Sequence, residues 1–136
     1  MNRIHEALAF QNVFAPQSVA ATTDKTSDYV DMSGVDEAVF LISTAALGAG
    51  KSLTVKLMAA SDSEGSDAEE IGSAKFTDAK GTAPQLAVVS YRASALHGRY
   101  AAVKFQHDGA AAVVCGVTAA ATALYRPASS GWTLVV

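Results

Sequence analysis

The sequence predicts an all-β domain, either an antiparallel β-sandwich or a jelly-roll-like barrel, with extended N- and C-terminal arms. Two observations lead to this prediction. Short segments in which apolar and polar residues alternate recur along the chain, separated by turns rich in Gly, Asp and Ser. No long amphipathic helix pattern interrupts them, and this combination is typical of sandwiches and barrels. The pattern does not distinguish a jelly roll from a simpler sandwich.

The centre of the predicted sheet is residues 38–59, AVFLISTAALGAGKSLTVKLMA. In its second half Leu53, Val55 and Leu57 alternate with polar or exposed positions, as in a half-buried strand. Residues 39–42 are apolar on both faces, as expected for a strand that is covered on both sides. We expect these two runs to form a β-hairpin or a pair of neighbouring strands.

The link between the two runs, residues 48–52, resembles the end of a phosphate-binding P-loop. That motif requires an earlier glycine, where this chain has Ala45, and a helix that follows the lysine. The residues after Ser52 alternate as a strand instead. We therefore interpret the segment as a flexible turn rather than a nucleotide site.

Further strands are predicted on either side of this centre. The clearest alternation is in RYAAVKFQ, where Ala101, Val103 and Phe105 are expected inside, and Asp108-Gly109 then predicts a hairpin turn. In the long strand that follows, Val113, Cys115 and Val117 share one face. The segments predicted as strands outside the centre are residues 27–32, 71–77, 85–92, 99–106 and 112–125.

The predicted domain organisation is an N-terminal arm at 1–24, a β-sandwich at 25–127 and a C-terminal tail at 128–136. Residues 1–24 lack strand alternation. Their apolar side chains could dock on the chain's own sheet or on a neighbouring subunit. The tail ends in a short apolar run that could tuck onto the sheet or anchor a partner. The interface candidates in these two segments are Phe10, Phe14, Trp132, Leu134 and Val135.

The residue pattern argues against an enzyme, a cofactor and a metal site. His5, His97 and His107 are not spaced as a metal pair, and no nucleophile lies in a recognisable catalytic motif. Cys115 is the one cysteine and lies in an apolar run, which predicts a buried, unreactive thiol. The acidic segment 61–70 lacks the spacing of a helix-loop-helix calcium site, so we interpret it as a solvated loop.

Charge and hydropathy exclude two further classes of partner. The formal net charge is −3 and the ten basic residues are scattered, whereas nucleic-acid binding requires a basic stripe. No apolar stretch approaches the length of a membrane span, and the first ten residues do not read as a secretory signal. We expect neither nucleic acid nor membrane as a partner.

The order of these segments resembles the small structural proteins of tailed bacteriophages that are described as head decoration, cement or minor virion proteins. The resemblance spans residues 20–127 and rests on segment order, turn placement and the strand GRYAAVKF. The segments that carry it are SDYVDMSGVDEAVFLISTAALGAG, KLMAASDSEGSDAEEIGSAKFTD, SYRASALHGRYAAVKFQHDG and AAVVCGVTAAATALYRP.

The resemblance implies an all-β virion structural protein, most specifically a capsid decoration protein that binds the major capsid protein and itself, with a trimer favoured. It implies a location on the capsid surface of the virion, and in the host cytoplasm during assembly. Two alternatives stay open. One is a structural role at the head–tail joint or in the tail. The other is a carbohydrate- or cell-surface-binding virion module, for which the aromatic candidates are Tyr29, Tyr91, Tyr100 and Trp132.

Overall fold

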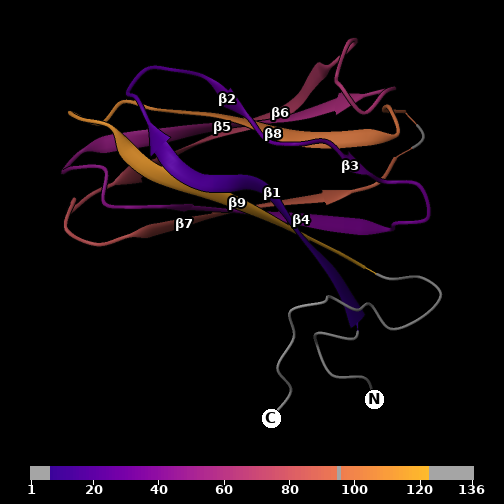
Figure 1. Ribbon diagram of the computed structural model, residues 1–136, viewed down its shortest axis with the longest axis horizontal. Helices are drawn as coiled ribbons and strands as arrows, with labels where there is room; N and C mark the ends of the chain where they lie inside the picture. The colour runs from indigo at the N-terminus through magenta and orange to yellow at the C-terminus, as the bar shows by residue number, and fades with distance from the viewer. Residues whose placement is uncertain (1–6, 95, 123–136) are drawn as a thin grey trace.

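The computed structural model describes residues 7–94 and 96–122, whose strands form two antiparallel sheets packed face to face (Figure 1). The all-β prediction is confirmed. The strands in chain order are β1 (Leu8–Val19), β2 (Lys25–Thr26), β3 (Val30–Asp31), β4 (Glu37–Thr44), β5 (Lys51–Ala60), β6 (Glu69–Asp78), β7 (Gln85–Arg92), β8 (Tyr100–His107) and β9 (Val113–Thr122).

The strand order identifies the sandwich as a jelly roll. The first sheet has the order β1-β9-β4-β7, and the second has β2-β8-β5-β6 with β3 also paired to β8. The chain therefore passes back and forth between the sheets, and the strands of its first and second halves interleave within each sheet. This wrapping places the two sheets over one shared core and selects the jelly roll from the two predicted alternatives.

The predicted hairpin at the centre of one sheet is wrong, because β4 and β5 belong to opposite sheets. Phe40 on β4 and Val55 on β5 are both buried in the core, where they enter from opposite sheets. The link 45–50 crosses between layers that in sandwiches lie about 10 Å apart. It is a turn, as predicted, with Gly50 at φ +76°. Asp108-Gly109 likewise joins β8 and β9 of different sheets rather than forming a hairpin.

The core lies between the two inner faces and matches the predicted alternation. Ala101, Val103 and Phe105 on β8 are buried, as predicted. On β9, the three residues predicted to share a face are also buried, including Cys115. The largest fully buried side chains are Phe40, Phe105, Ile42, His107, Val13, Val19, Val55, Val103, Val117 and Cys115.

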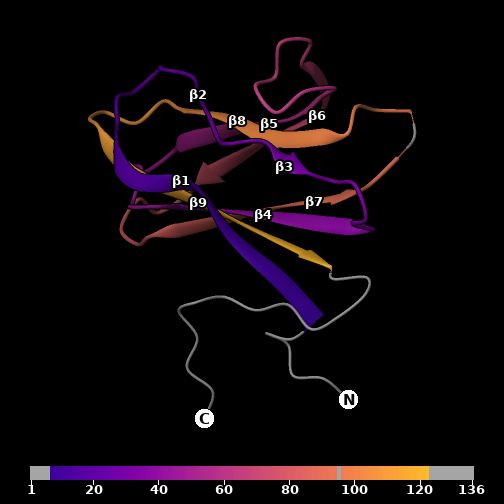
Figure 2. The same cartoon turned by 45° about the vertical axis from the view of Figure 1, so that its right-hand side comes forward.

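The structure differs from the predicted N-terminal arm at 1–24, because Leu8–Val19 form β1 and pair with β9 along the edge of the first sheet (Figure 2). Phe14 packs edge-to-face on Phe105 of the other sheet, with 5.1 Å between ring centroids. Register shifts on both sides of Phe14 break the period of two, so the strand carries no alternation in sequence. The predicted tail, 128–136, lies outside the described residues.

A buried histidine at the end of β8 is hydrogen-bonded to the last residue of β1. His107 is fully buried; its Nε2–H donates to the carbonyl oxygen of Val19 at 2.7 Å, while its Nδ1 accepts from the backbone N–H of Gly109 at 3.1 Å. These partners require the neutral tautomer with the proton on Nε2. His107 is therefore a structural residue, with both ring nitrogens hydrogen-bonded.

Candidate functional site

The outward face of the first sheet is largely apolar, and most of it is at least partly exposed in the described chain, although Gly116, which lies close to Pro16, and Ala120 are buried. Its most exposed large side chains come from three different strands: Leu86 is 61% exposed, Val88 53%, Val114 52% and Phe10 47%. We call this surface the apolar outer face. By strand register it consists of Phe10, Asn12, Val39, Leu41, Ser43, Leu86, Val88, Ser90, Val114, Gly116, Thr118 and Ala120.

Cross-strand pairing makes this surface continuous. Leu41 lies opposite Val88 on β7 and opposite Thr118 on β9, so an apolar side chain occupies the middle of the sheet. The charged residues that share this face in the described strands are Glu37 and Arg92 at one end, where Arg92 Nη2 lies 3.6 Å from a Glu37 carboxylate oxygen. The centre of the face therefore carries no charge and can be desolvated at low cost.

The outward face of the second sheet has a different character. Lys56 lies opposite Lys104 on β8, and Lys75 lies on the neighbouring edge strand. Lys104 is half-exposed and reaches Asp24 at 3.8 Å. Like charges placed opposite one another keep this face hydrated. The two faces of one sandwich thus differ in what they can bind, and only the apolar outer face is suited to a dry protein contact.

The sandwich is also open along one side, between the edge strands β6 and β7. Two adjoining hollows of about 340 and 380 Å³ lie there, and Phe76 lines both. We call them together the β6–β7 groove. The first hollow is lined by Ile42, Thr44, Leu47, Leu53, Lys75, Phe76, Thr77, Asp78, Gln85, Leu86 and Ala87. The second is lined by Val55, Leu57, Ile71, Gly72, Ser73, Ala74, Phe76, Val88, Val89 and Ser90.

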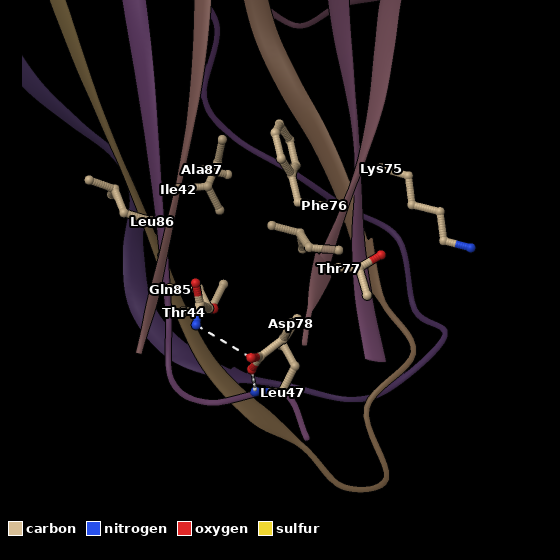
Figure 3. A pocket seen from close by; sticks show the side chains of 11 residues that line it. Ile42, Thr44, Leu47, Lys75, Phe76, Thr77, Asp78, Gln85, Leu86 and Ala87 are labelled. Carbon is tan, nitrogen blue, oxygen red and sulfur yellow. Dashed lines mark hydrogen bonds between the residues drawn. The ribbon is translucent and has the colours of Figure 1, made fainter. Parts of the chain in front are cut away.

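One end of the first hollow is polar (Figure 3). The buried Asp78 carboxylate accepts hydrogen bonds from the backbone N–H of Leu47 at 3.0 Å and of Gly81 at 2.9 Å, and from Gln85 Nε2 at 3.4 Å. Asp78 therefore joins the link 45–50 to the loop 79–84 and to the start of β7. The hydroxyl of Thr44, a residue that is 3% exposed, lines the same hollow and has no hydrogen-bond partner among the described residues.

In the acidic segment 61–70, the carboxylates of Asp62 and Asp67 accept hydrogen bonds from other residues of the same segment. Asp62 accepts from the N–H of Ser66 and of Glu64, and the Ser66 bond is the main reason that its pKa is lowered. Asp67 accepts from the hydroxyl and N–H of Ser61, which lower its pKa as well. In residues 7–94 and 96–122, no group of three or more His, Cys, Asp or Glu side chains is placed to hold a metal ion.

A surface ion pair ties β3 to the start of β8. Arg99 donates from Nε and Nη2 to the two carboxylate oxygens of Asp31, at 2.8 and 2.6 Å. These bonds, with a further one from the Ser33 N–H, hold the pKa of Asp31 well below its usual range. The Arg99 guanidinium also lies 5.4 Å from the centre of the Tyr100 ring. The pair is exposed, so it orients the short strand more than it stabilises the domain.

Cys115 is 1% exposed, and burial raises the pKa of its thiol to about 11. At about pH 8 only about one thiol in a thousand is then ionised. We expect the folded protein to resist a thiol reagent such as Ellman's reagent, and the protein in denaturant to react fully with one equivalent. Rapid stoichiometric reaction of the folded protein would contradict the buried placement.

The sequence-predicted interface residues fall in different places. Phe10 is exposed on the apolar outer face, whereas Phe14 docks on the chain's own core through Phe105. Trp132, Leu134 and Val135 lie outside the described residues. Sequence reasoning missed Leu41 and Val88 as surface residues. The signal was present, since a strand that is apolar on both faces needs a cover on its outer side, and the described chain supplies none for residues 39–42.

The aromatic residues considered for carbohydrate binding do not form a common platform in the described chain. Tyr91 is buried on the inner side of β7. Tyr29 packs against Gly65, and burial, followed by the charges of Asp62 and Asp67, raises its pKa. The Arg99 guanidinium lies over the ring of Tyr100. A stacking surface for a sugar ring requires exposed rings that lie together.

A bilayer-crossing helix, of sufficient length and apolar character, is not found within the described ranges.

Comparisons with solved structures agree on the fold. The PBSX exported protein XepA superposes with a TM-score of 0.56 at 9% identity, over 94% of this chain and 39% of that one. A subunit of the Bacillus endospore appendages, described as disulfide-linked pili, gives a TM-score of 0.50 at 15% identity, over 91% of this chain and 97% of that one. This chain thus spans well under half of the XepA chain. No protein-family model and no curated protein matches the sequence. At these identities the likeness shows the fold alone.

Proposed function

We propose that this protein is a virion structural protein, and more specifically a capsid decoration protein that stabilises an assembled head shell. Its partner is the major capsid protein, and it acts on the capsid surface as a homo-oligomer, with a trimer favoured. The observation that carries the proposal is the contrast between the apolar outer face and the lysine-bearing face of the second sheet. A protein with one dry face and one hydrated face is suited to lying flat on a larger assembly.

The energetics of such a role fit a small apolar surface. Exposed apolar patches on soluble domains mark protein contacts, and burial of apolar area contributes about 25 cal/mol per Å². A single patch of this kind gives a modest affinity. A shell presents the same site many times, and an oligomer that engages several sites gains avidity without new contacts. We propose a non-catalytic role, since shell stabilisation requires no acid, base or nucleophile.

The fold is compatible with this proposal, and it is equally compatible with a binding module. Jelly rolls occur in viral capsid and lectin domains alike, so the architecture admits both a shell protein and a binding module. The proposal favours the shell because the exposed apolar residues gather on one sheet, whereas the aromatic residues that a sugar site needs are dispersed.

The test is a charge placed at the centre of the apolar outer face. Leu41→Asp puts a carboxylate between Val88 and Thr118, where a bound partner would have to desolvate it. We expect at least about a tenfold loss of affinity for assembled shells of the phage that encodes the chain. Co-sedimentation of the purified protein with shells, over a range of protein concentrations, measures this loss.

The matched control is Thr54→Asp, which adds the same charge to the outward side of the central strand β5 in the other sheet. It should bind shells as the unmodified protein does. Both variants should keep the Cys115 thiol protected, which shows that they are folded. Shell binding by Leu41→Asp at full strength would rule out the apolar outer face as the contact. Binding to isolated tails but not to shells would move the protein to the tail.

A further inference from the structure

The β6–β7 groove has the properties of a site that accepts an added β-strand. Among the described strands, β6 pairs with β5 alone and β7 with β4 alone, so each leaves one edge of backbone N–H and C=O groups without a strand partner. Every β6 residue except Asp78 is at least partly exposed. Edge strands are usually protected by charges or proline, but β7 carries neither between Gln85 and Tyr91.

The side chains between these edges suit an apolar strand. Phe76 separates two hollows, so the groove offers two neighbouring compartments rather than one long trough. In an extended segment, residues i and i+2 lie on one side about 6.8 Å apart, as successive compartments require. Thr44 also lines the first compartment, and its buried hydroxyl has no hydrogen-bond partner among the described residues. The backbone of an added apolar strand would form hydrogen bonds with the free N–H and C=O groups of an edge strand, and its side chains would fill the two hollows.

The sequence contains one segment of this chemistry outside the described residues. Residues 128–136, ASSGWTLVV, carry no charge and place Trp132, Leu134 and Val136 on one side of an extended chain. The other such terminal segment, residues 1–6, contains Arg3 and Glu6, which an apolar groove would exclude. Nine residues lie between Thr122 and Trp132, and the ten Cα–Cα steps that they make can span roughly 33–36 Å when extended, so the segment can leave its own sandwich.

We propose that residues 128–136 of one copy bind as an added strand in the β6–β7 groove of a second copy, with Trp132 entering one of the two compartments. The contact is head-to-tail, because the segment and the groove are different surfaces, and such contacts close into rings such as trimers. The groove shares Leu86, Val88 and Ser90 with the apolar outer face. Ala74 lies outside that face, so a charge placed there tests the groove separately from the shell contact.

Trp132 is the chain's one tryptophan, so its fluorescence reports directly on the segment. We expect the full-length protein to self-associate, and its emission to shift to shorter wavelength as association proceeds with concentration. Ala74→Glu puts a carboxylate in the groove, because Ala74 pairs with the inward Val55. Leu134→Asp charges the segment and keeps the probe. Each variant should weaken self-association by about tenfold or more and return the emission towards that of exposed tryptophan.

A complementation experiment decides between this exchange and other forms of association. Ala74→Glu retains an intact segment and Leu134→Asp an intact groove, so a mixture of the two should form one-to-one dimers that neither forms alone. Mass in solution, measured by light scattering, identifies them. The control is Thr54→Glu, which adds the same charge on the outward side of β5, opposite Lys75 and away from the groove, and should associate normally.

Three results would overturn the proposal. The first is a mixture that stays monomeric. The second is a blue-shifted emission from a monomer at every concentration, which places the segment on its own sandwich. The third is equal behaviour of the Ala74→Glu and Thr54→Glu variants, provided that both keep the Cys115 thiol protected.

Discussion

Replacement of Phe105 by alanine is expected to lower the free energy of unfolding by about 3–5 kcal/mol, the range found for buried aromatic truncations. Phe105 is 1% exposed and lies on β8, where its ring meets the edge of Phe14 from the other sheet at 5.1 Å between centroids. The substitution therefore removes a large buried side chain and a contact that joins the two sheets. Domains of this size have only about 5–15 kcal/mol of stability, so the loss is a large part of the total.

Thermal and urea unfolding measure this effect, and we expect a fall in Tm of roughly 10–20 °C. Phe10→Ala is the matched control, since Phe10 is 47% exposed and its loss leaves no internal cavity. It should cost about 1 kcal/mol or less. If the two alanine variants unfolded at the same denaturant concentration, Phe105 would not occupy the interior position described.

Replacement of Gly81 by alanine is expected to destabilise the domain by about 3 kcal/mol or more. Gly81 has φ +68°, a conformation that costs a side-chain-bearing residue about 1–2 kcal/mol. A Cβ atom there would also lie 2.1 Å from the backbone nitrogen of Ala49, so the two loops would have to separate. Since the Gly81 N–H donates to Asp78, this movement also disturbs the carboxylate that holds Leu47 in place.

Gly50→Ala separates the two causes. Gly50 has a similar backbone conformation, φ +76°, but a Cβ atom there would meet nothing within 4 Å. It should lose only the backbone component, about 1–2 kcal/mol, in the same urea unfolding measurement. Equal losses for the two alanine variants would show that the close approach of the loops around Gly81 does not matter for stability.

The fold class was predictable because most strands follow a simple rule. On β8, Ala101, Val103 and Phe105 are buried, whereas Tyr100, Lys104 and Gln106 on the other side are partly exposed, so local pattern and packing agree. What could not be predicted is which strands are neighbours. The period of two in β4 and β5 is the same whether they form a hairpin or face each other across a core. Whether they are neighbours depends on whether the chain crosses from one sheet to the other between them, and no pattern in the local sequence indicates that crossing.

The candidate surfaces were harder to predict than the fold. β1 was missed because the irregularities around Phe14 remove its alternation, although Val13 and Val19 are fully buried. The apolar outer face was not predicted because its residues follow a regular pattern that is also typical of an interior. Leu41 and Val88 look like interior residues in sequence, and hydropathy cannot distinguish a side chain covered by its own chain from one reserved for another.

The pairing of β1 with β9 has a consequence for how the chain is made. β9 lies between β1 and β4, with Leu8 opposite Thr122, so the first sheet cannot close until Val113–Thr122 has left the ribosome. The complete sandwich can therefore form only after β9 has emerged, and its many distant contacts place it among slow folders, in the range of milliseconds to seconds. A ribosome that stalls before β9 releases a chain with two bare strand edges. Such a chain is prone to aggregate until β9 pairs with both edges.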